Sequence, residues 1–172
     1  MRSIDAKPYI ELLDGRPVEK VSPKRTHALL QFGIAAMLQA RAGDRGDVAT
    51  EWRFWLNPGE PKKTTLVPDV AFVSIERINA LAPKDREEPP FAPDVAFEVR
   101  SPSDRVTNVE WKMQAYLANG SAVVFDVIPD ERIVRAFTRD GVTTLRIGDR
   151  FSSDRLPWLT FDVADVFANL PQ

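Results

Sequence analysis

Two acidic residues occupy positions where a charge is costly to bury. Asp69 opens the apolar run 70–73, and Glu98 lies inside the apolar run 95–99, which is typical of a central strand. Burial of a lone carboxylate costs several kcal/mol unless it is paired, protonated or bound to a metal. These two residues are therefore the first candidates for a functional site.

A third candidate, Lys112, lies in the predicted helix that follows the strand of Glu98, beside Trp111, Met113 and Tyr116. This helix should pack back over the sheet, because a strand and the helix after it are usually adjacent. Two carboxylates on neighbouring strands with a nearby lysine suit phosphodiester hydrolysis. The carboxylates would hold a divalent cation that activates water, and the ammonium would orient that water or stabilise the developing charge.

Simpler interpretations exist for all three residues. Asp69 could be a turn residue that initiates a strand, Glu98 could form a salt bridge with Arg100 or Arg53, and Lys112 could be a solvated helix lysine. In those cases the three side chains would not meet.

The composition limits the other chemistries. The 172 residues contain no cysteine and one histidine, His27, which excludes disulfides, thiolate zinc sites, a cysteine nucleophile and a His-rich zinc site. A metal here would be held mainly by oxygen, which favours Mg²⁺ or Mn²⁺. The formal net charge of −2 argues against a strongly basic nucleic-acid binder, although a locally basic surface is still possible. No run is long and apolar enough for a membrane span or a signal peptide, so we expect a cytoplasmic protein.

The hydrophobic patterns predict a mixed α/β (α+β) arrangement in one domain, 1–172. The crossover 94–128, strand then helix then strand, implies a parallel pair within a mixed sheet flanked by helices. The polar segment 75–92 reads as a short helix at 75–81 and a charged, Pro-rich loop. The predicted elements are a hairpin at 9–21, a helix from Ser22-Pro23 to Ala42-Gly43, strands at 48–56, 67–73, 94–100 and 123–128, a helix from Ser103 or Asp104 to Asn119, a late hairpin at 132–147 and a short helix at 163–169.

The phrase Pro-Asp-Val-Ala-Phe occurs twice, at 68–72 and 93–97. Two similar strands that enter one site would explain the repeat. Coincidence in a sheet rich in valine, alanine and phenylalanine would explain it equally well.

Taken together, the motifs resemble the Uma family of restriction endonucleases, within the PD-(D/E)xK nuclease superfamily. The resemblance covers roughly 10–137 and implies a restriction-endonuclease-like fold with a nuclease core at about 22–128 and an additional β-hairpin. Its motifs are Val-Glu-Lys-Val-Ser-Pro at 18–23 followed by His27, Pro-Asp-Val at 68–70, the run 93–103, and Lys112-Met113 with Tyr116, Asn119 and Gly120.

The resemblance also implies roles for individual residues. Asp69 matches the metal-binding aspartate, and Glu98 matches the acid of the (D/E)xK element. The lysine of that element is replaced by Arg100, which could pair with Glu98, bind phosphate or face solvent. The family's lysine would then be Lys112, on the following helix.

Supporting positions are less sharply defined by the resemblance. His27 and Glu51 match polar positions near the site, and Tyr116 completes the lysine–x3–tyrosine motif. Asp94 belongs to the second Pro-Asp, and the resemblance gives it no fixed role.

The leading functional hypothesis is a metal-dependent DNA endonuclease that uses Mg²⁺ or Mn²⁺ and acts as a homodimer, because cutting both strands needs two sites. RNA or branched DNA could also be the substrate. The alternative is a catalytically degenerate binding or assembly module associated with mobile elements, which Arg100 and the acidic balance favour modestly. A glycosidase is a weaker possibility, since the tryptophans do not cluster near Glu98 in the sequence.

Overall fold

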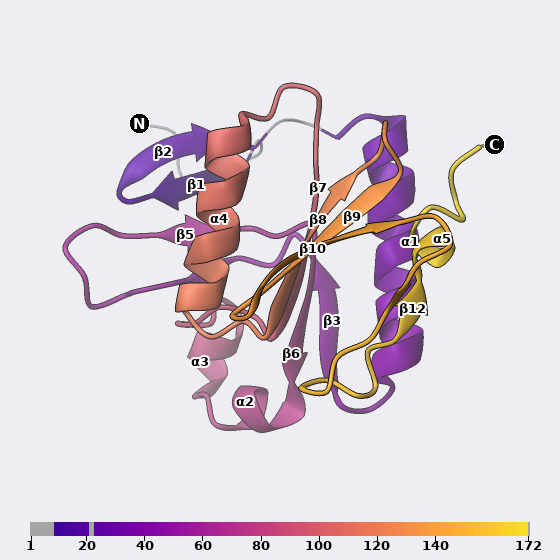
Figure 1. Ribbon diagram of the computed structural model, residues 1–172. Coiled ribbons are helices and arrows are strands. Elements are labelled where there is room, and N and C mark those ends of the chain that lie inside the picture. Colours follow the sequence, from indigo (N-terminus) through magenta and orange to yellow (C-terminus); the bar gives the residue numbers. More distant parts are fainter. Residues whose placement is uncertain (1–8, 21–22, 172) are drawn as a thin grey trace.

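The computed structural model describes residues 9–20 and 23–171. Its central element is a mixed sheet of six strands in the order β10-β9-β8-β7-β6-β3 (Figure 1). Only β7 and β8 pair in parallel, and every other neighbouring pair is antiparallel. The strands are β3 (Gly46–Thr50), β6 (Val70–Ser74), β7 (Val95–Val99), β8 (Val123–Ile128), β9 (Ile133–Thr138) and β10 (Gly141–Arg146).

A second, smaller sheet lies beside the first and contains the N-terminal hairpin. Its order is β2-β1-β5-β4, and a separate two-stranded sheet is formed by β11 and β12. The strands are β1 (Ile10–Leu13), β2 (Arg16–Glu19), β4 (Phe54–Trp55), β5 (Thr65–Leu66), β11 (Arg150–Phe151) and β12 (Phe161–Asp162).

Two long helices cover opposite faces of the central sheet, α1 (Arg25–Ala42) on one and α4 (Val106–Ala118) on the other (Figure 1). α2 (Ile75–Asn79) and α3 (Pro83–Arg86) follow β6, and α5 (Val163–Val166) packs on α1. In the described part of the chain, no helix has the length and apolar character that a membrane crossing requires.

Side-chain alternation along β7 separates two cores. Val95, Phe97 and Val99 pack in the core on the α1 side, whereas Ala96 packs in the core on the α4 side. Because successive side chains of a strand point to opposite faces, Glu98 faces α4. On the α1 side, Phe97 stacks on Phe125 with ring centroids 4.4 Å apart.

The antiparallel register of β6 and β7 brings the two candidate carboxylates together. Val70 pairs with Phe97, so the same register continued by one residue sets Asp69 opposite Glu98. Directly opposed residues in such a pair have Cβ atoms roughly 5 Å apart. The same register sets Ala71 opposite Ala96, and Asp94 therefore lies at the far end of the pair.

The mixed sheet with flanking helices and an additional hairpin confirms the predicted fold class. The main strands, both hairpins and the two long helices also appear where the sequence predicts them. Ser22, the predicted helix cap, lies outside the described residues, and α1 begins at Arg25.

Two local predictions are wrong. The single strand predicted at 48–56 is two strands in different sheets, because Glu51 adopts a left-handed conformation (φ 53°) that ends β3. The predicted loop after 82 contains the short helix α3, and the pair β11–β12 was not predicted.

Gly46 provides a test of the packing of β3 on β6. A Cβ at this position would lie 2.0 Å from the Val73 carbonyl oxygen and 2.8 Å from the Ser74 Cα, both backbone atoms that cannot move cheaply. Gly46→Ala should therefore destabilise the protein by about 3 kcal/mol, measured by urea unfolding. Gly59→Ala, where a Cβ meets nothing within 4 Å, is the control and should change stability little. Equal stability of the two variants would contradict this account.

Candidate active site

Asp69 lies immediately before β6 and is almost completely buried, with 1% of its surface exposed. Its Oδ2 accepts a hydrogen bond of 2.6 Å from the Val99 backbone N–H and lies 3.2 Å from His27 Nε2. Its Oδ1 faces the Lys20 ammonium at 2.6 Å. One carboxylate is thus surrounded by a lysine, a histidine and the backbone next to Glu98.

Glu98 is held by two side chains of α4. Lys112 Nζ donates to Oε2 at 2.9 Å, and the Tyr116 hydroxyl donates to Oε1 at 2.8 Å. The two donors are four residues apart and so share one face of the helix, which is the face turned to the sheet. The ionic partner of Glu98 is therefore Lys112, and the alternative pairings with Arg100 or Arg53 are not observed.

The N-terminal hairpin contributes two further charged residues, Glu11 and Lys20. Glu11 Oε2 lies 3.1 Å from Lys112 Nζ, and its Oε1 accepts from the Val67 backbone N–H at 2.9 Å. Lys20 Nζ donates to the Val67 carbonyl oxygen at 2.6 Å in addition to facing Asp69. Neither residue is among the site residues predicted from the sequence. Glu11 could have been found as a charge between apolar neighbours in a short strand. Lys20 could have been found from its place in the motif at 18–23.

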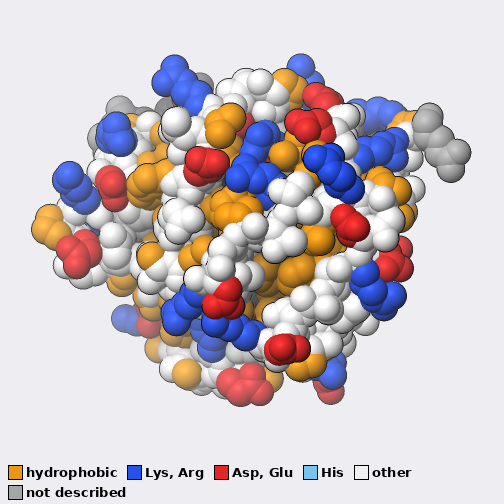
Figure 2. All heavy atoms as spheres, viewed as in Figure 1, with side chains coloured by type: hydrophobic (Ala, Val, Ile, Leu, Met, Phe, Trp, Pro, Cys, Tyr) orange, Lys and Arg blue, Asp and Glu red, His pale blue; other side chains and the backbone are white. Residues whose placement is uncertain are grey.

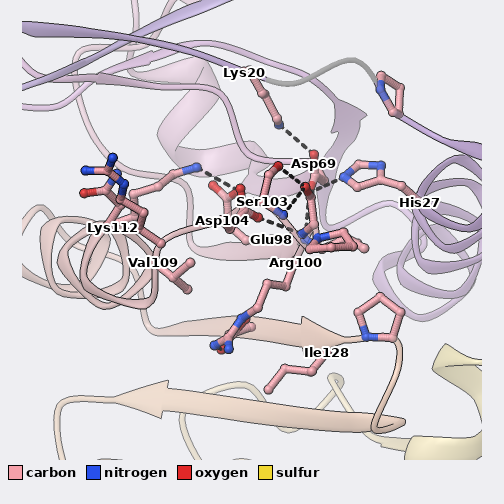
Figure 3. Close-up of a pocket in the computed structure, with 18 of the residues that line it drawn as sticks. Lys20, His27, Asp69, Glu98, Arg100, Ser103, Asp104, Val109, Lys112 and Ile128 are labelled. Atoms are coloured by element: carbon pink, nitrogen blue, oxygen red, sulfur yellow. Dashed lines mark hydrogen bonds and ion pairs between the residues drawn. The ribbon is translucent and has the colours of Figure 1, made fainter.

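These residues line a cavity of about 660 Å³ between the hairpin, the start of α1 and the start of α4. Figure 3 shows Lys20 and His27 approaching Asp69 while Lys112 reaches Glu98 from α4. Charged side chains of both signs are interspersed over the face of the molecule in Figure 2, without one continuous basic region. The positive charge next to Asp69 and Glu98 comes from Lys20 and Lys112.

The cavity carries an excess of negative charge. In the described part of the chain, seven acidic residues line it, against five lysines and arginines and His27, and three of the carboxylates (Asp69, Glu98 and Glu11) share the ammonium groups of Lys20 and Lys112. Burial opposes ionisation of Asp69, but the charge of Lys20 and the hydrogen bond from His27 outweigh it and hold the pKa of Asp69 well below its usual value. Burial dominates at Glu98 and raises its pKa to about 7, although the two lysines favour ionisation.

The pKa values of the basic groups Lys112 and His27 are raised. Burial favours the neutral form of Lys112, yet the charges of Glu11 and Glu98 raise its pKa well above the usual value. The pKa of His27 is also raised, because its hydrogen bond to Asp69 outweighs the effect of burial. Both lysines are therefore cationic at neutral pH and act as charge partners or donors, not as bases.

The donor chemistry fits a hard divalent cation. Asp69 and Glu98 offer carboxylate oxygens on adjacent strands, and a cation would correct the negative excess of the cavity. Among the described residues the buried Oδ1 of Asp69 has only the Lys20 ammonium as a partner, so a cation that displaces this ammonium would gain the oxygen as a ligand. Within the described ranges, no cluster of three or more His, Cys, Asp or Glu side chains is arranged to hold a metal.

Arg100 lines the same cavity but is engaged by Asp126, which is buried on β8. Its Nε and Nη2 contact the two carboxylate oxygens at 3.2 and 2.5 Å, and Arg135 approaches the same carboxylate at 3.5 Å. Of the three possibilities for Arg100, pairing with Glu98 is not observed. The guanidinium instead neutralises the acidic neighbour of Glu98 on the parallel strand.

Two other predicted residues do not join the cavity. Asp94 lies at the opposite end of β7, where it accepts from the Ser74 N–H and pairs with Arg77 at 2.8 Å. Glu51 lines a smaller, separate pocket, and only its backbone N–H reaches the Asp69 carbonyl oxygen, at 3.4 Å. The repeated Pro-Asp-Val-Ala-Phe motif therefore does not bring two aspartates to one site, because its strands run antiparallel.

The raised pKa of Glu98 predicts that the metal-free protein loses stability as the pH rises. Above the usual pKa of 4.5 the unfolded chain ionises first, and the penalty is complete once the pH exceeds about 7. The raised pKa of His27 acts in the same direction. Thermal unfolding in the presence of a chelator should show the midpoint falling from about pH 5 to about pH 8. Glu98→Gln should reduce this fall by a few degrees, and identical curves for both proteins would contradict the assignment.

Comparison with known proteins identifies the family of this chain. Over residues 2–164 the sequence matches the Uma2 family, described as "Putative restriction endonuclease". No curated protein matches the sequence. The crystal structure of a putative nuclease belonging to DUF820 from Anabaena variabilis has a TM-score of 0.84 at 18% identity, over 96% of this chain and 93% of that chain, which indicates a shared fold. Since the family match covers nearly the whole chain, this protein belongs to the Uma2 family of restriction-endonuclease-like proteins.

Proposed function

We propose that this protein is a metal-dependent endonuclease that hydrolyses phosphodiester bonds of DNA with Mg²⁺ or Mn²⁺. The observation that carries the proposal is the opposition of Asp69 and Glu98 on adjacent strands, in one cavity with Lys112. Membership of the Uma2 family supports the nuclease class.

In this proposal Asp69 and Glu98 hold the cation, which polarises the scissile phosphate and makes a bound water more acidic. His27 and the Val99 N–H keep the Asp69 carboxylate in place. Tyr116 does the same for Oε1 of Glu98, and Oε2, which now accepts from Lys112, would turn to the cation. One oxygen of each carboxylate is therefore held by a neighbour that need not move when the site is loaded, while Lys20 and Lys112 would release the other oxygen.

Lys112 is the proposed donor to the attacking water or to a phosphate oxygen. Its ammonium has three N–H donors; Glu98 accepts one of them, and Glu11 lies at ion-pair distance, 3.1 Å. Once Glu98 turns to the cation, Glu11 still anchors Lys112 beside the reacting phosphate. Arg100 stands where the superfamily's motif has lysine, and its engagement by Asp126 explains why Lys112 would take over that role.

Cutting both strands of a duplex requires two sites, so we propose that the active form is a homodimer. We also propose a cytoplasmic location, where cellular or invading DNA would be the substrate. Analytical ultracentrifugation tests the dimer, and cell fractionation tests the location.

A second candidate is a binding or assembly module that keeps the fold without catalysis. The observation that favours it is the closed pairing of Asp69 with Lys20 and of Glu98 with Lys112, in which the carboxylates already have cationic partners. Metal binding separates the two functions, because a module of this kind has no reason to bind Mn²⁺ at Asp69.

Removal of either carboxylate charge should abolish both metal binding and cleavage. Asp69→Asn and Glu98→Gln keep the side-chain size, so we expect Mn²⁺ affinity to fall by at least about 100-fold and cleavage of plasmid DNA to fall by a similar factor or more. Calorimetry with Mn²⁺ and a gel assay measure the two effects. Glu76→Gln, at an exposed position on α2, is the control and should match the wild type. Undiminished Mn²⁺ binding by Asp69→Asn would disprove the proposed metal site.

Replacement of the helix lysine should slow cleavage and leave the metal in place. For Lys112→Met we expect a rate loss of about 100-fold to 10,000-fold, since the donor to the reacting group is removed, while Mn²⁺ binding persists. Lys112→Arg should recover part of the rate. A rate for Lys112→Met close to that of the wild type would show that this ammonium has no part in the reaction.

A further inference from the structure

The N-terminal hairpin places a second ammonium group in the cavity. Lys20 directly follows β2, belongs to no strand of the central sheet, and has 15% of its side chain exposed. Its Nζ lies 2.6 Å from Asp69 Oδ1 and 2.6 Å from the Val67 carbonyl oxygen, and the residue lines the cavity with Glu98 and Lys112. The lysine thus reaches the same carboxylate that the proposed cation would use.

The partners of the two lysines differ in one respect. Lys112 has two carboxylates within ion-pair distance, Glu11 and Glu98, whereas Lys20 has only Asp69 among the described residues. If a cation takes oxygens of both Asp69 and Glu98, Lys112 keeps Glu11 as its counter-charge. Lys20 keeps only a neutral carbonyl, and two of its three N–H donors become available.

A buried ammonium without a counter-charge is unstable and seeks an anion. The anion that enters this cavity during the proposed reaction is the phosphodiester. Repulsion from the cation also favours movement of Lys20 away from Asp69, towards the negative charge of the phosphate.

We propose that Lys20 is a second catalytic residue, whose ammonium turns from Asp69 to a non-bridging oxygen of the scissile phosphate and stabilises the charge that develops there. This inference rests on the proposed nuclease function. In the hydrolysis, water oxygen bonds to phosphorus, one phosphorus–oxygen ester bond breaks, and the proton released by the water ends on the leaving alcohol. Lys20 donates a hydrogen bond throughout and transfers no proton.

The alternative role for Lys20 is structural, in that it neutralises a buried aspartate and holds it in position. The two roles predict opposite changes in metal affinity. A lysine that competes with the cation for Asp69 weakens metal binding, so its removal should tighten it. A lysine that only positions Asp69 supports metal binding, so its removal should weaken it.

The test compares Lys20→Met with the wild type in two measurements. Single-turnover cleavage of DNA at saturating Mn²⁺ should slow by about 100-fold or more, the usual loss for one donor to a developing oxyanion. Calorimetric affinity for Mn²⁺ without DNA should rise by about tenfold, because a unit positive charge beside the site has been removed. Lys20→Arg should retain much of the rate, and Lys62→Met, at an exposed position outside the cavity, should behave as the wild type.

The outcomes separate this inference from the function on which it rests. Wild-type protein that cleaves, with Lys20→Met within about threefold of its rate, overturns the role of Lys20 alone. A slow Lys20→Met whose Mn²⁺ affinity falls, and whose rate recovers when Mn²⁺ is raised, also overturns it and assigns a positioning role. Wild-type protein that binds no Mn²⁺ and cleaves no nucleic acid overturns the proposed function and this inference together. If Lys20→Met does not fold, Lys20→Gln replaces it, since the amide can still donate to the Val67 carbonyl oxygen.

Discussion

The desolvation of two opposed carboxylates dictates much of this structure. Asp69 and Glu98 lie on adjacent central strands with almost no contact with water, a situation that is unfavourable by several kcal/mol for each uncompensated charge. The chain compensates them with elements from outside those strands: α4 supplies Lys112 and Tyr116, α1 supplies His27, and the N-terminal hairpin supplies Lys20. The fold around the site therefore brings lysines, a histidine and a hydroxyl donor to one end of two adjacent strands of the sheet.

The compensation is incomplete, and this gives the site its chemical character. Glu11 adds a third carboxylate that shares Lys112, and in the described part of the chain the cavity is lined by seven acidic and six basic residues. A fully neutralised cluster would have no affinity for a further cation. Here a divalent ion has both oxygen ligands and a favourable field, and the lysines that it displaces stay close enough to act on a bound anion.

The sequence predicts the core of this site because burial of charge leaves a readable trace. An acid inside an apolar strand, as at Glu98, and a lysine one crossover later, as at Lys112, are visible without coordinates. Glu11 and Lys20 were missed because their importance depends on where a peripheral hairpin docks, and neither periodicity nor composition specifies that contact. The positions of Glu51 and Asp94 could not be predicted for geometric reasons: a left-handed residue ends one strand early, and an antiparallel pairing sends the second Pro-Asp to the far end of the sheet.

The alternation along β7 has a consequence for how such proteins diverge. Residues 95, 97 and 99 meet a dry core in which Phe97 stacks on Phe125, and there one apolar side chain can be exchanged for another of similar volume. The side chain of residue 98 accepts hydrogen bonds from Lys112 and Tyr116 and has no such freedom. Substitution can therefore change positions 95, 97 and 99 at little cost in stability, whereas position 98 is constrained by its charge partner and its hydroxyl donor.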